Sequence, residues 1–423
     1  MLNILVVGHA CLPEAGSELG VSWNWAWHLA ARNRVWVITH GHFRPLIERH
    51  LRDNPRQNLR FIWVGPLGWW DPWSGDRSRG IRLHYIMWQP AVVAAAKRLI
   101  AAEPIDVIHH VSWATLNAPS LLWQAGKPFI WGPIGGGQIL PWRFLPLLGV
   151  AAGPELLRTA RVSVMPWMRN LRRTVARTDL ILAVNKETAA LLRRAGAQRV
   201  SLLSDGGVPA ASVAPPRTGR GGGAPLTILW ASRLEAFKGL GICLDVAKAI
   251  RTRDVRFLIA GGGSLRSWAE RRARDLGLDD RVTFLGRLSW QEMQQRLAAA
   301  DLFMFTSFRD TFGTVNFEAV AKGCPVICLD HNGVGTHLPD DAAIKVPVTT
   351  PGAVISEMAR KIEALASDRA RLGRMAEAAY RFAEAQRWDR RVLLMEQLFR
   401  QILEQRAANR AAGILDTGYT PAV

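Results

Sequence analysis

Two basic side chains have the spacing and setting expected of a diphosphate site. Arg233 and Lys238 lie in WASRLEAFKGL, directly after a short apolar run that is predicted to be a strand. In parallel sheets ligands bind beyond the carboxyl ends of strands, so both cations are expected to point into a crevice. A planar guanidinium and a compact ammonium together suit the oxygens of a diphosphate. Taken alone, such a pair is more often two solvated surface cations, which is the alternative interpretation.

A run of glycines follows the next predicted strand. Gly261, Gly262 and Gly263 lie in AGGGSL, where the absence of side chains lets a backbone approach a ligand closely. The segment lacks the complete Gly-x-Gly-x-x-Gly pattern of dinucleotide-binding loops. A plain connection from strand to helix is therefore the alternative interpretation.

The segment SFRDTFGTVNFEAVAKGCPVI carries the most specific pattern, two acids around a glycine turn. The chain is expected to turn at Gly313 and then to begin a helix, whose free amides and positive dipole end favour a phosphate. Asp310 lies before the turn and Glu318 lies inside the helix, so their carboxylates are expected to reach hydroxyls at opposite ends of one ligand. The alternative is an exposed helix with two unconnected acids.

Fewer residues with defined chemistry occur in the first half. His109 and His110 follow a predicted strand in DVIHH. Histidines at strand ends are more often packed or solvated. Gly16, in the loop ACLPEAGSELG, either lets the chain approach a ligand or makes a turn.

Tryptophan and arginine are concentrated in the first half. Fourteen of the eighteen tryptophans precede residue 200, among them Trp69, Trp70, Trp73, Trp142 and Trp167. Tryptophan stacks on sugar rings and also sits at membrane interfaces. Arginines that alternate with apolar residues between 156 and 178, without an acid, are typical of segments that bind anionic lipid, although a solvated helix face is the alternative. The arginines proposed for this contact with a membrane or an acceptor are Arg169, Arg172 and Arg173.

Short apolar runs alternate with helical patterns in both halves, which predicts two parallel sheets covered by helices. The strands are expected at 4–7, 35–39, 59–64, 107–111, 128–131, 180–184, 227–230, 256–260, 282–285, 302–306 and 326–329. A stretch rich in glycine and proline separates the halves. The expected organisation is a first domain over 1–205, a linker over 206–225, a second domain over 226–385, a helix over 386–406 that packs on the first domain, and a flexible tail over 407–423.

The overall composition limits which partners and which cellular compartment the protein is expected to have. A formal charge of +19 and a pI near 11 require a partner of opposite sign, such as nucleic acid, anionic lipid or a phosphorylated substrate. Four scattered cysteines without Cys-x-x-Cys spacing disfavour a disulfide framework and a zinc site, and fit a reducing cytoplasm. Neither a signal peptide nor a membrane-spanning helix is expected, because the apolar stretches are short or interrupted.

Asp310 and Glu318, with seven residues between them, resemble the acidic pair of retaining glycosyltransferases of family 4, also called group 1, which have the GT-B fold. The resemblance implies that Asp310 contacts the donor sugar and that Glu318 binds the ribose. It assigns Arg233 and Lys238 to the diphosphate, and Arg287, in GRL, to the region where the nucleobase stacks. The residues whose backbone would hold the phosphate and sugar are Phe312, Gly313, Thr314 and Val315.

Further similarity lies in the first half, where the resemblance makes His109 or His110 the candidate active-site histidine near the reacting sugar. ACLPEAGSELGVSWNWAWHLA and PFIWGPIGGG resemble segments of family 4 enzymes of bacterial surface polysaccharide pathways. The family usually has Glu where this chain has Asp310, and commonly Gly where it has Thr311, so the sugar preference is left open. The fold implied is two Rossmann-like parallel-sheet domains that face a cleft, with a C-terminal helix crossing back to the first domain.

The expected function is retaining transfer of a sugar from a nucleoside-diphosphate sugar to a hydroxyl. The acceptor to expect is a polyprenyl-diphosphate-linked oligosaccharide in exopolysaccharide, capsule or lipopolysaccharide synthesis, at the inner face of the cell membrane. No metal or other cofactor is expected, since no Asp-x-Asp occurs in the chain. No nucleic-acid partner is expected, because recognisable RNA-binding signatures are absent. The alternatives are an epimerase or hydrolase of nucleotide sugars with the GT-B fold, and a non-enzymatic protein that binds membrane or RNA.

Overall fold

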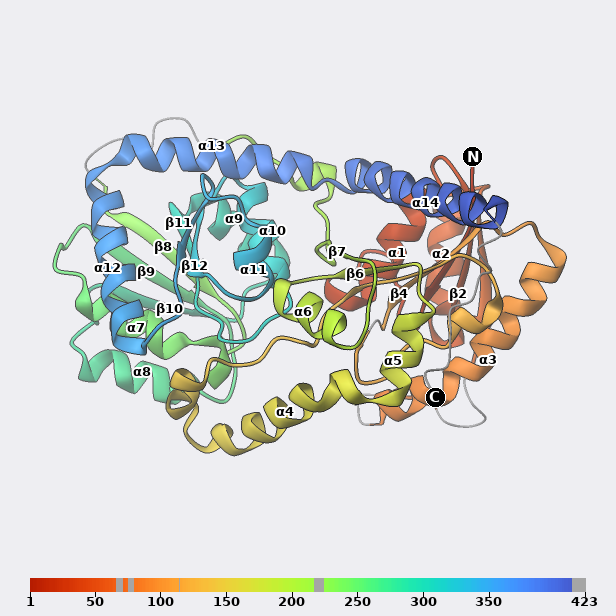
Figure 1. Ribbon diagram of the computed structural model, residues 1–423. Coiled ribbons are helices and arrows are strands. Elements are labelled where there is room, and N and C mark those ends of the chain that lie inside the picture. Colours follow the sequence, from red (N-terminus) through yellow and green to blue (C-terminus); the bar gives the residue numbers. More distant parts are fainter. Residues whose placement is uncertain (66–70, 75–79, 114, 217–223, 413–423) are drawn as a thin grey trace. The chain divides into compact units, whose positions relative to one another are not determined.

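The chain folds into two compact units, each built on a parallel sheet (Figure 1). The first unit comprises Met1–Gly137, Ser163–Gly206 and Trp388–Val423, and the second comprises Gln138–Val162 and Gly207–Arg387. The prediction of two Rossmann-like parallel-sheet domains is confirmed. The computed structural model describes residues 1–65, 71–74, 80–113, 115–216 and 224–412.

Seven parallel strands form the first sheet, in the order β3-β2-β1-β4-β5-β6-β7. Every residue of β4 and β5 is buried because helices cover both faces of the sheet, and β4 buries His109 and His110 among its apolar residues. The strands are β1 (Asn3–Gly8), β2 (Arg34–His40), β3 (Leu59–Val64), β4 (Val107–Ser112), β5 (Phe129–Ile134), β6 (Leu180–Ala183) and β7 (Val200–Leu202).

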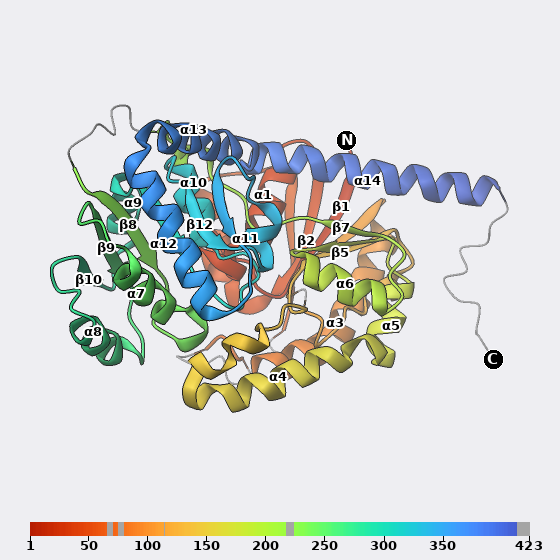
Figure 2. The same ribbon diagram turned by 60° about the vertical axis from the view of Figure 1, so that its left-hand side comes forward.

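The C-terminal helix packs on the first unit, beside α1, as both views show (Figures 1 and 2). Its apolar stripe of Trp388, Val392, Met395, Phe399 and Ile402 joins the core of this unit. The helices of the unit are α1 (Ser17–Leu29), α2 (Arg44–Asp53), α3 (Ile81–Ala102), α5 (Arg169–Ala176), α6 (Lys186–Arg194) and α14 (Trp388–Ala411). The helix thus extends beyond the expected end at 406, and residues 413–423 of the expected tail lie outside the described residues.

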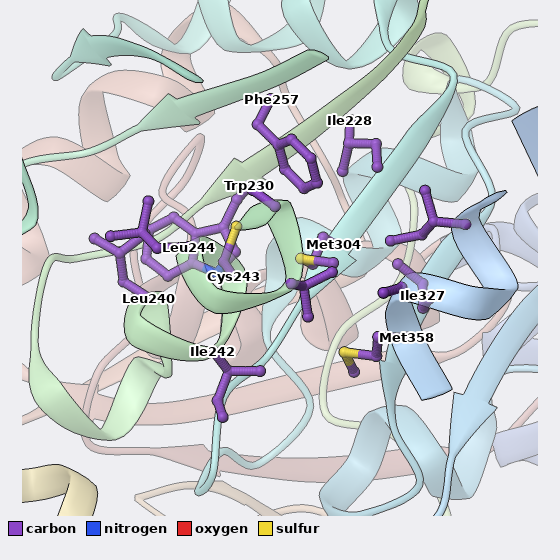
Figure 3. Close-up of a cluster of buried hydrophobic side chains, with 14 of the residues drawn as sticks. Ile228, Trp230, Leu240, Ile242, Cys243, Leu244, Phe257, Met304, Ile327 and Met358 are labelled. Carbon is purple, nitrogen blue, oxygen red and sulfur yellow. The ribbon is translucent and has the colours of Figure 1, made fainter. Parts of the chain in front are cut away.

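The second unit has six parallel strands in the order β10-β9-β8-β11-β12-β13. Side chains from the strands and from α7 and α12 form its core, with Trp230 and Phe257 among the largest fully buried residues (Figure 3). The strands are β8 (Leu226–Ala231), β9 (Val255–Ala260), β10 (Val282–Gly286), β11 (Leu302–Phe305), β12 (Val326–Leu329) and β13 (Ala343–Val346). The helices are α7 (Leu240–Ala249), α8 (Arg266–Asp275), α9 (Trp290–Ala299), α10 (Thr314–Ala321), α11 (Asn332–His337), α12 (Pro351–Ser367) and α13 (Arg369–Ala385).

One segment of the first half belongs to the second unit. It comprises η3 (Trp142–Ala151) and most of α4 (Ala152–Val164), and we call Gln138–Val162 the inserted segment. The buried ring of Phe144 packs on Phe308, with ring centroids 5.1 Å apart, and Leu140 and Leu148 join the same core. The expectation of one continuous domain over 1–205 is therefore wrong for this segment, because its apolar side chains are buried in the second unit.

The expected linker over 206–225 is also attached to the second unit where it is described. Val208 donates a backbone hydrogen bond to Gln386, and Ala214 donates one to Ala321. Lys322 Nζ reaches the carbonyl of Ser212 at 2.8 Å. The glycines and prolines here therefore make a fixed connection up to residue 216 rather than a free linker, and 217–223 lie outside the described residues.

A buried arginine anchors the start of α14. Arg391, 4% exposed, donates from Nη1 to Ser204 Oγ at 2.9 Å and from Nη2 to the Ser204 carbonyl at 2.5 Å. Burial lowers the pKa of Arg391 to about 10, an effect that the charge of Asp205 opposes. The cation is still charged at neutral pH and must keep these partners.

Replacing Arg391 by Met should lower the free energy of unfolding by about 2 kcal/mol, because the buried Ser204 acceptors lose their donors. Thermal unfolding followed by circular dichroism measures the loss. The matched control is Arg400→Met on the exposed side of the same helix, which should leave the melting temperature unchanged. Equal melting curves for the two variants would contradict the anchoring role.

Candidate active site

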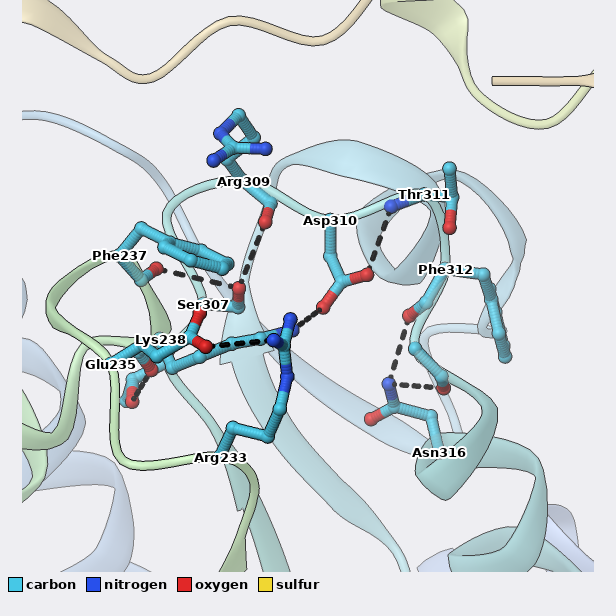
Figure 4. A network of polar contacts seen from close by, with 12 residues as sticks. Arg233, Glu235, Phe237, Lys238, Ser307, Arg309, Asp310, Thr311, Phe312 and Asn316 are labelled. Carbon is cyan, nitrogen blue, oxygen red and sulfur yellow. Dashed lines mark hydrogen bonds and ion pairs between the residues drawn. The ribbon is translucent and has the colours of Figure 1, made fainter. Parts of the chain in front are cut away.

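The site centres on an ion pair between two loops of the second unit. Lys238 Nζ lies 2.5 Å from Asp310 Oδ2, and the two side chains are only 12% and 15% exposed (Figure 4). Lys238 follows β8 in η6 (Ala236–Lys238), and Asp310 follows β11, the neighbouring strand of the sheet. The carboxyl ends of adjacent parallel strands thus bring the two residues together, where parallel sheets bind ligands.

Backbone contacts fix these two loops on each other. Phe308 N donates to the Phe237 carbonyl at 2.8 Å, and Thr306 Oγ1 donates to the Gly239 carbonyl at 2.9 Å. Gly239 has φ 72°, and a Cβ there would lie 2.1 Å from the Thr306 carbonyl oxygen, so only glycine fits. Lys238 and Asp310 are therefore positioned by the main chain as well as by their mutual attraction.

The turn after Asp310 is held by its own hydrogen bonds. Thr311 N donates to Asp310 Oδ1 at 3.0 Å, and the buried Asn316 donates from Nδ2 to the carbonyls of Phe312 and Gly313 at 3.0 and 2.9 Å (Figure 4). Gly313 has φ 81°, and a Cβ would lie 2.8 Å from Phe305 Cζ. The chain thus turns at Gly313 and begins α10 at Thr314 as expected, which leaves free amides at a positive dipole end.

The four residues assigned to this turn differ in exposure. The ring of Phe312 is buried, 1% exposed, and packs on Phe317 with centroids 4.3 Å apart, so only its main chain can meet a ligand. Thr314 is exposed, and Gly313 and Val315 are both half-buried. Backbone groups rather than side chains therefore form this part of the site.

Glu318 projects from α10 toward α9. Gln294, which the sequence did not point out, donates from Nε2 to Glu318 Oε2 at 3.0 Å. Burial raises the pKa of Glu318, while the hydrogen bond from Gln294 and the charge of Lys322 act in the opposite direction. The carboxylate is thus oriented by an amide and retains acceptor capacity for a hydroxyl.

Arg233 lies on the same loop as Lys238 but is far more accessible. Its side chain is 70% exposed, and Nη1 lies 2.7 Å from Glu235 Oε1. Exposed ion pairs of this kind contribute under about 1 kcal/mol, so a diphosphate can displace Glu235. Arg233 is therefore placed to bind an incoming anion, whereas Lys238 is already held.

The glycine run packs against the Arg233 loop. A Cβ on Gly261 would lie 1.9 Å from the Ser232 carbonyl oxygen, and one on Gly263 would lie 2.6 Å from that of Leu234. Gly262 accepts a hydrogen bond from Leu234 N at 3.1 Å and lies under the exposed Arg287 side chain. These glycines thus allow two loops to approach closely, and their predicted contact with the donor stays a prediction.

His109 and His110 are buried in the first unit, 0% and 1% exposed. His109 Nε2 contacts the Gly132 carbonyl at 2.8 Å, and His110 Nδ1 contacts Ser120 Oγ at 2.8 Å. Burial lowers their pKa values to about 4 and about 3, so both rings are neutral at pH 7. The geometry favours the packed alternative over a catalytic role for either one.

A different histidine cluster, which the sequence did not indicate, lies around His9 in the first unit. His9 directly follows β1, and its Nε2 lies 3.3 Å from Nδ1 of His84 on α3. The His9 ring also lies 5.6 Å from Trp73 and 5.9 Å from Trp113, centroid to centroid. The only sequence signal was a histidine at the end of the first strand, where doubly wound sheets place ligands.

The remaining expected residues occupy exposed surface. Gly16 caps α1, and an added Cβ would meet nothing within 4 Å, so no contact of the structure requires glycine there.

Trp142 in the second unit is 75% exposed, and Trp167 in the first unit is 69% exposed. On α5 the side chains of Arg169, Arg172 and Arg173 are exposed. Trp69 and Trp70 lie outside the described residues.

Residues 222–382 match the family described as glycosyl transferases group 1. We call this part of the chain, which resembles group 1 glycosyl transferases, the group 1 domain. It contains the candidate donor-site residues from Arg233 to Glu318, whereas Gly16 lies outside it.

Two relatives support the assignment of this domain. The alpha-D-kanosaminyltransferase of Streptomyces kanamyceticus is 31% identical over 156 residues, which cover 36% of this chain and 39% of the relative. The D-inositol 3-phosphate glycosyltransferase of Nocardia farcinica is 32% identical over 171 residues, 38% of this chain and 37% of the relative. The matched region spans less than two fifths of either relative's length.

The fold extends beyond the group 1 domain. The Anabaena HepE structure in complex with UDP superposes with a TM-score of 0.56 at 19% identity, covering 97% of this chain and all of that one. This similarity assigns the GT-B fold. Among the described residues, no helix combines the length and apolar character needed to cross a bilayer.

Substituting Glu318 by Gln should change the pH dependence of stability. Burial raises the folded-state pKa of Glu318, so the folded state holds this proton more tightly than the unfolded state. The residue's contribution to stability is therefore present below its unfolded pKa and is lost as pH rises through the folded pKa. Melting temperatures between about pH 4 and pH 8 should show Glu318→Gln gaining on the wild type as pH rises. A difference in melting temperature that is constant with pH would contradict the raised pKa of Glu318 in the folded state.

Proposed function

We propose that the protein transfers a sugar from a nucleoside-diphosphate sugar to a hydroxyl acceptor with retention of the anomeric configuration. The observation that carries this proposal is the Lys238–Asp310 pair at adjacent strand ends of a group 1 domain. HepE, which shares the fold, binds UDP, so uridine diphosphate sugars are the donors to test first. Retention rests on the resemblance of Asp310 and Glu318 to the family's acidic pair.

Catalysis in this proposal is largely electrostatic. As the bond between the sugar C1 and the diphosphate oxygen breaks, negative charge develops on the diphosphate. Lys238, Arg233 and the free amides at the start of α10 are placed to stabilise this charge. Because these groups supply positive charge without a metal, we expect none to be required.

The other donor-site residues then bind the rest of the donor. Asp310 holds Lys238 and lies next to the sugar, and Glu318 binds the ribose hydroxyls. Arg287, above Gly262, lies where the nucleobase stacks. An arginine plane and a carboxylate are suited to a base and a diol, respectively.

A polyprenyl-diphosphate-linked oligosaccharide at an anionic membrane surface is the acceptor we propose. Support comes from the outward face of the inserted segment, where Trp142, Val150 and Leu157 are 75%, 101% and 76% exposed. Exposed arginines on α5 and a net charge of +19 favour anionic headgroups. The resemblance places the reaction in exopolysaccharide, capsule or lipopolysaccharide synthesis, at the inner face of the cell membrane.

Lys238→Ala tests the proposed reaction. Loss of a preorganised cation at the leaving group should lower sugar transfer at least about 100-fold. Transfer is measured by mass spectrometry with a nucleotide-sugar panel and membrane extract, and Lys248→Ala on the exposed side of α7 is the control. Wild-type turnover of Lys238→Ala would refute the proposal, and equal consumption of donor without acceptor would indicate a hydrolase or epimerase.

Membrane binding is tested with vesicles containing anionic phosphatidylglycerol. The variant Trp142→Ser/Leu157→Ser should cosediment less than the wild type, because it removes two apolar side chains from the proposed contact. Trp290→Ser, which replaces a tryptophan 60% exposed elsewhere in the second unit, is the control.

Replacing Arg169 by Gln should weaken binding to the same vesicles about fivefold, since each cation near the surface contributes about 1 kcal/mol. Binding that none of these changes affects would remove the membrane from the proposal.

A further inference from the structure

Arg309 stands beside the donor-site ion pair without being part of it. It directly precedes Asp310, and its guanidinium lies 4.5 Å above the ring of Phe237, the residue before Lys238 (Figure 4). Lys238 Nζ lies 5.2 Å from the same ring. Each of the two loops therefore contributes one residue to the ion pair and a neighbouring residue to a cation–π contact.

The partner of Arg309 comes from outside the group 1 domain. Arg309 Nε lies 3.1 Å from Oε1 of Glu155, on α4 in the inserted segment. The Glu155 side chain is only 6% exposed and also pairs with Arg158, at 3.2 Å. A carboxylate buried to this degree must keep its cations, so Glu155 fixes Arg309 from a segment distant in sequence.

The inserted segment is held in place by contacts with the rest of the second unit. Phe144 packs on Phe308, the residue before Arg309. Arg158 Nη2 donates to the Gln138 carbonyl at 2.9 Å, and His331 Nε2 contacts the Ile139 carbonyl at 3.1 Å. Glu155 therefore has a defined position relative to the loop that carries Asp310.

We propose that Glu155 and Arg309 are positioning residues that hold the loop of Asp310, and thereby Lys238, in the geometry for transfer. The proposal rests on the donor site described under the proposed function. It adds that the inserted segment, through Glu155, is part of the catalytic apparatus although it lies outside residues 222–382. Neither side chain needs to touch the donor for this role.

The test compares kcat and KM in the full chain for Glu155→Gln, Arg309→Gln and the double variant. Each single variant should lower kcat about tenfold and leave KM for the acceptor unchanged. The double variant should be no worse than the poorer single variant, because the two residues act as a unit. Arg309→Lys, which keeps a cation facing Glu155, should recover part of the lost kcat.

Controls separate positioning from loss of structure. Arg360→Gln breaks the exposed Arg360–Glu357 pair on α12 and should leave kcat unchanged. Melting temperatures above the assay temperature for every variant establish that the folded protein is assayed. Wild-type kcat in both single variants, or losses that multiply in the double variant, would overturn the positioning role. Lys238→Ala assayed in parallel separates the two claims, since its wild-type turnover would instead refute the donor site itself.

Discussion

The ion pair between Lys238 and Asp310 is the contact on which the proposed donor site depends. It joins loops after two neighbouring strands, β8 and β11, and these loops are also linked by a main-chain hydrogen bond at Phe237 and by the Thr306 hydroxyl at the Gly239 carbonyl. Since both side chains are mostly shielded from water, their attraction is screened less than that of a surface pair. The turn at Gly313 and the start of α10 place free amides near the same loop, so in the proposed function positive charge is in position before a diphosphate binds.

Supporting contacts for both units come from segments distant in sequence. In the second unit the inserted segment contributes Phe144 to the core and Glu155 to Arg309. In the first unit α14 contributes Arg391 to Ser204 and Glu396 to Asn33, whose Nδ2 donates to Oε1 at 2.7 Å. Buried charges are costly without partners, so each of these contacts ties a distant segment to one defined position.

Much of the fold was predictable because buried parallel strands are short apolar runs of β-branched residues. The strands that were missed, Val200–Leu202 and Ala343–Val346, form the outer edges of their sheets and are short. The inserted segment was misassigned because burial of Phe144 against Phe308 is a long-range contact without a local pattern. Lys238, Asp310 and the turn at Gly313 could be proposed as candidates from the sequence because loop chemistry at strand ends is a local pattern. Arg309, Gln294 and His9 could not, because their contacts are with residues that only the fold brings near.

The central claim is that the second unit holds a diphosphate through Lys238. Calorimetric titration with UDP and with uridine monophosphate measures the contribution of the second phosphate directly. The wild type should bind UDP more tightly than the monophosphate by at least about tenfold, or 1.4 kcal/mol, and Lys238→Ala should lose most of this difference. An undiminished preference for UDP in Lys238→Ala, or equal affinity of the wild type for both nucleotides, would contradict the account.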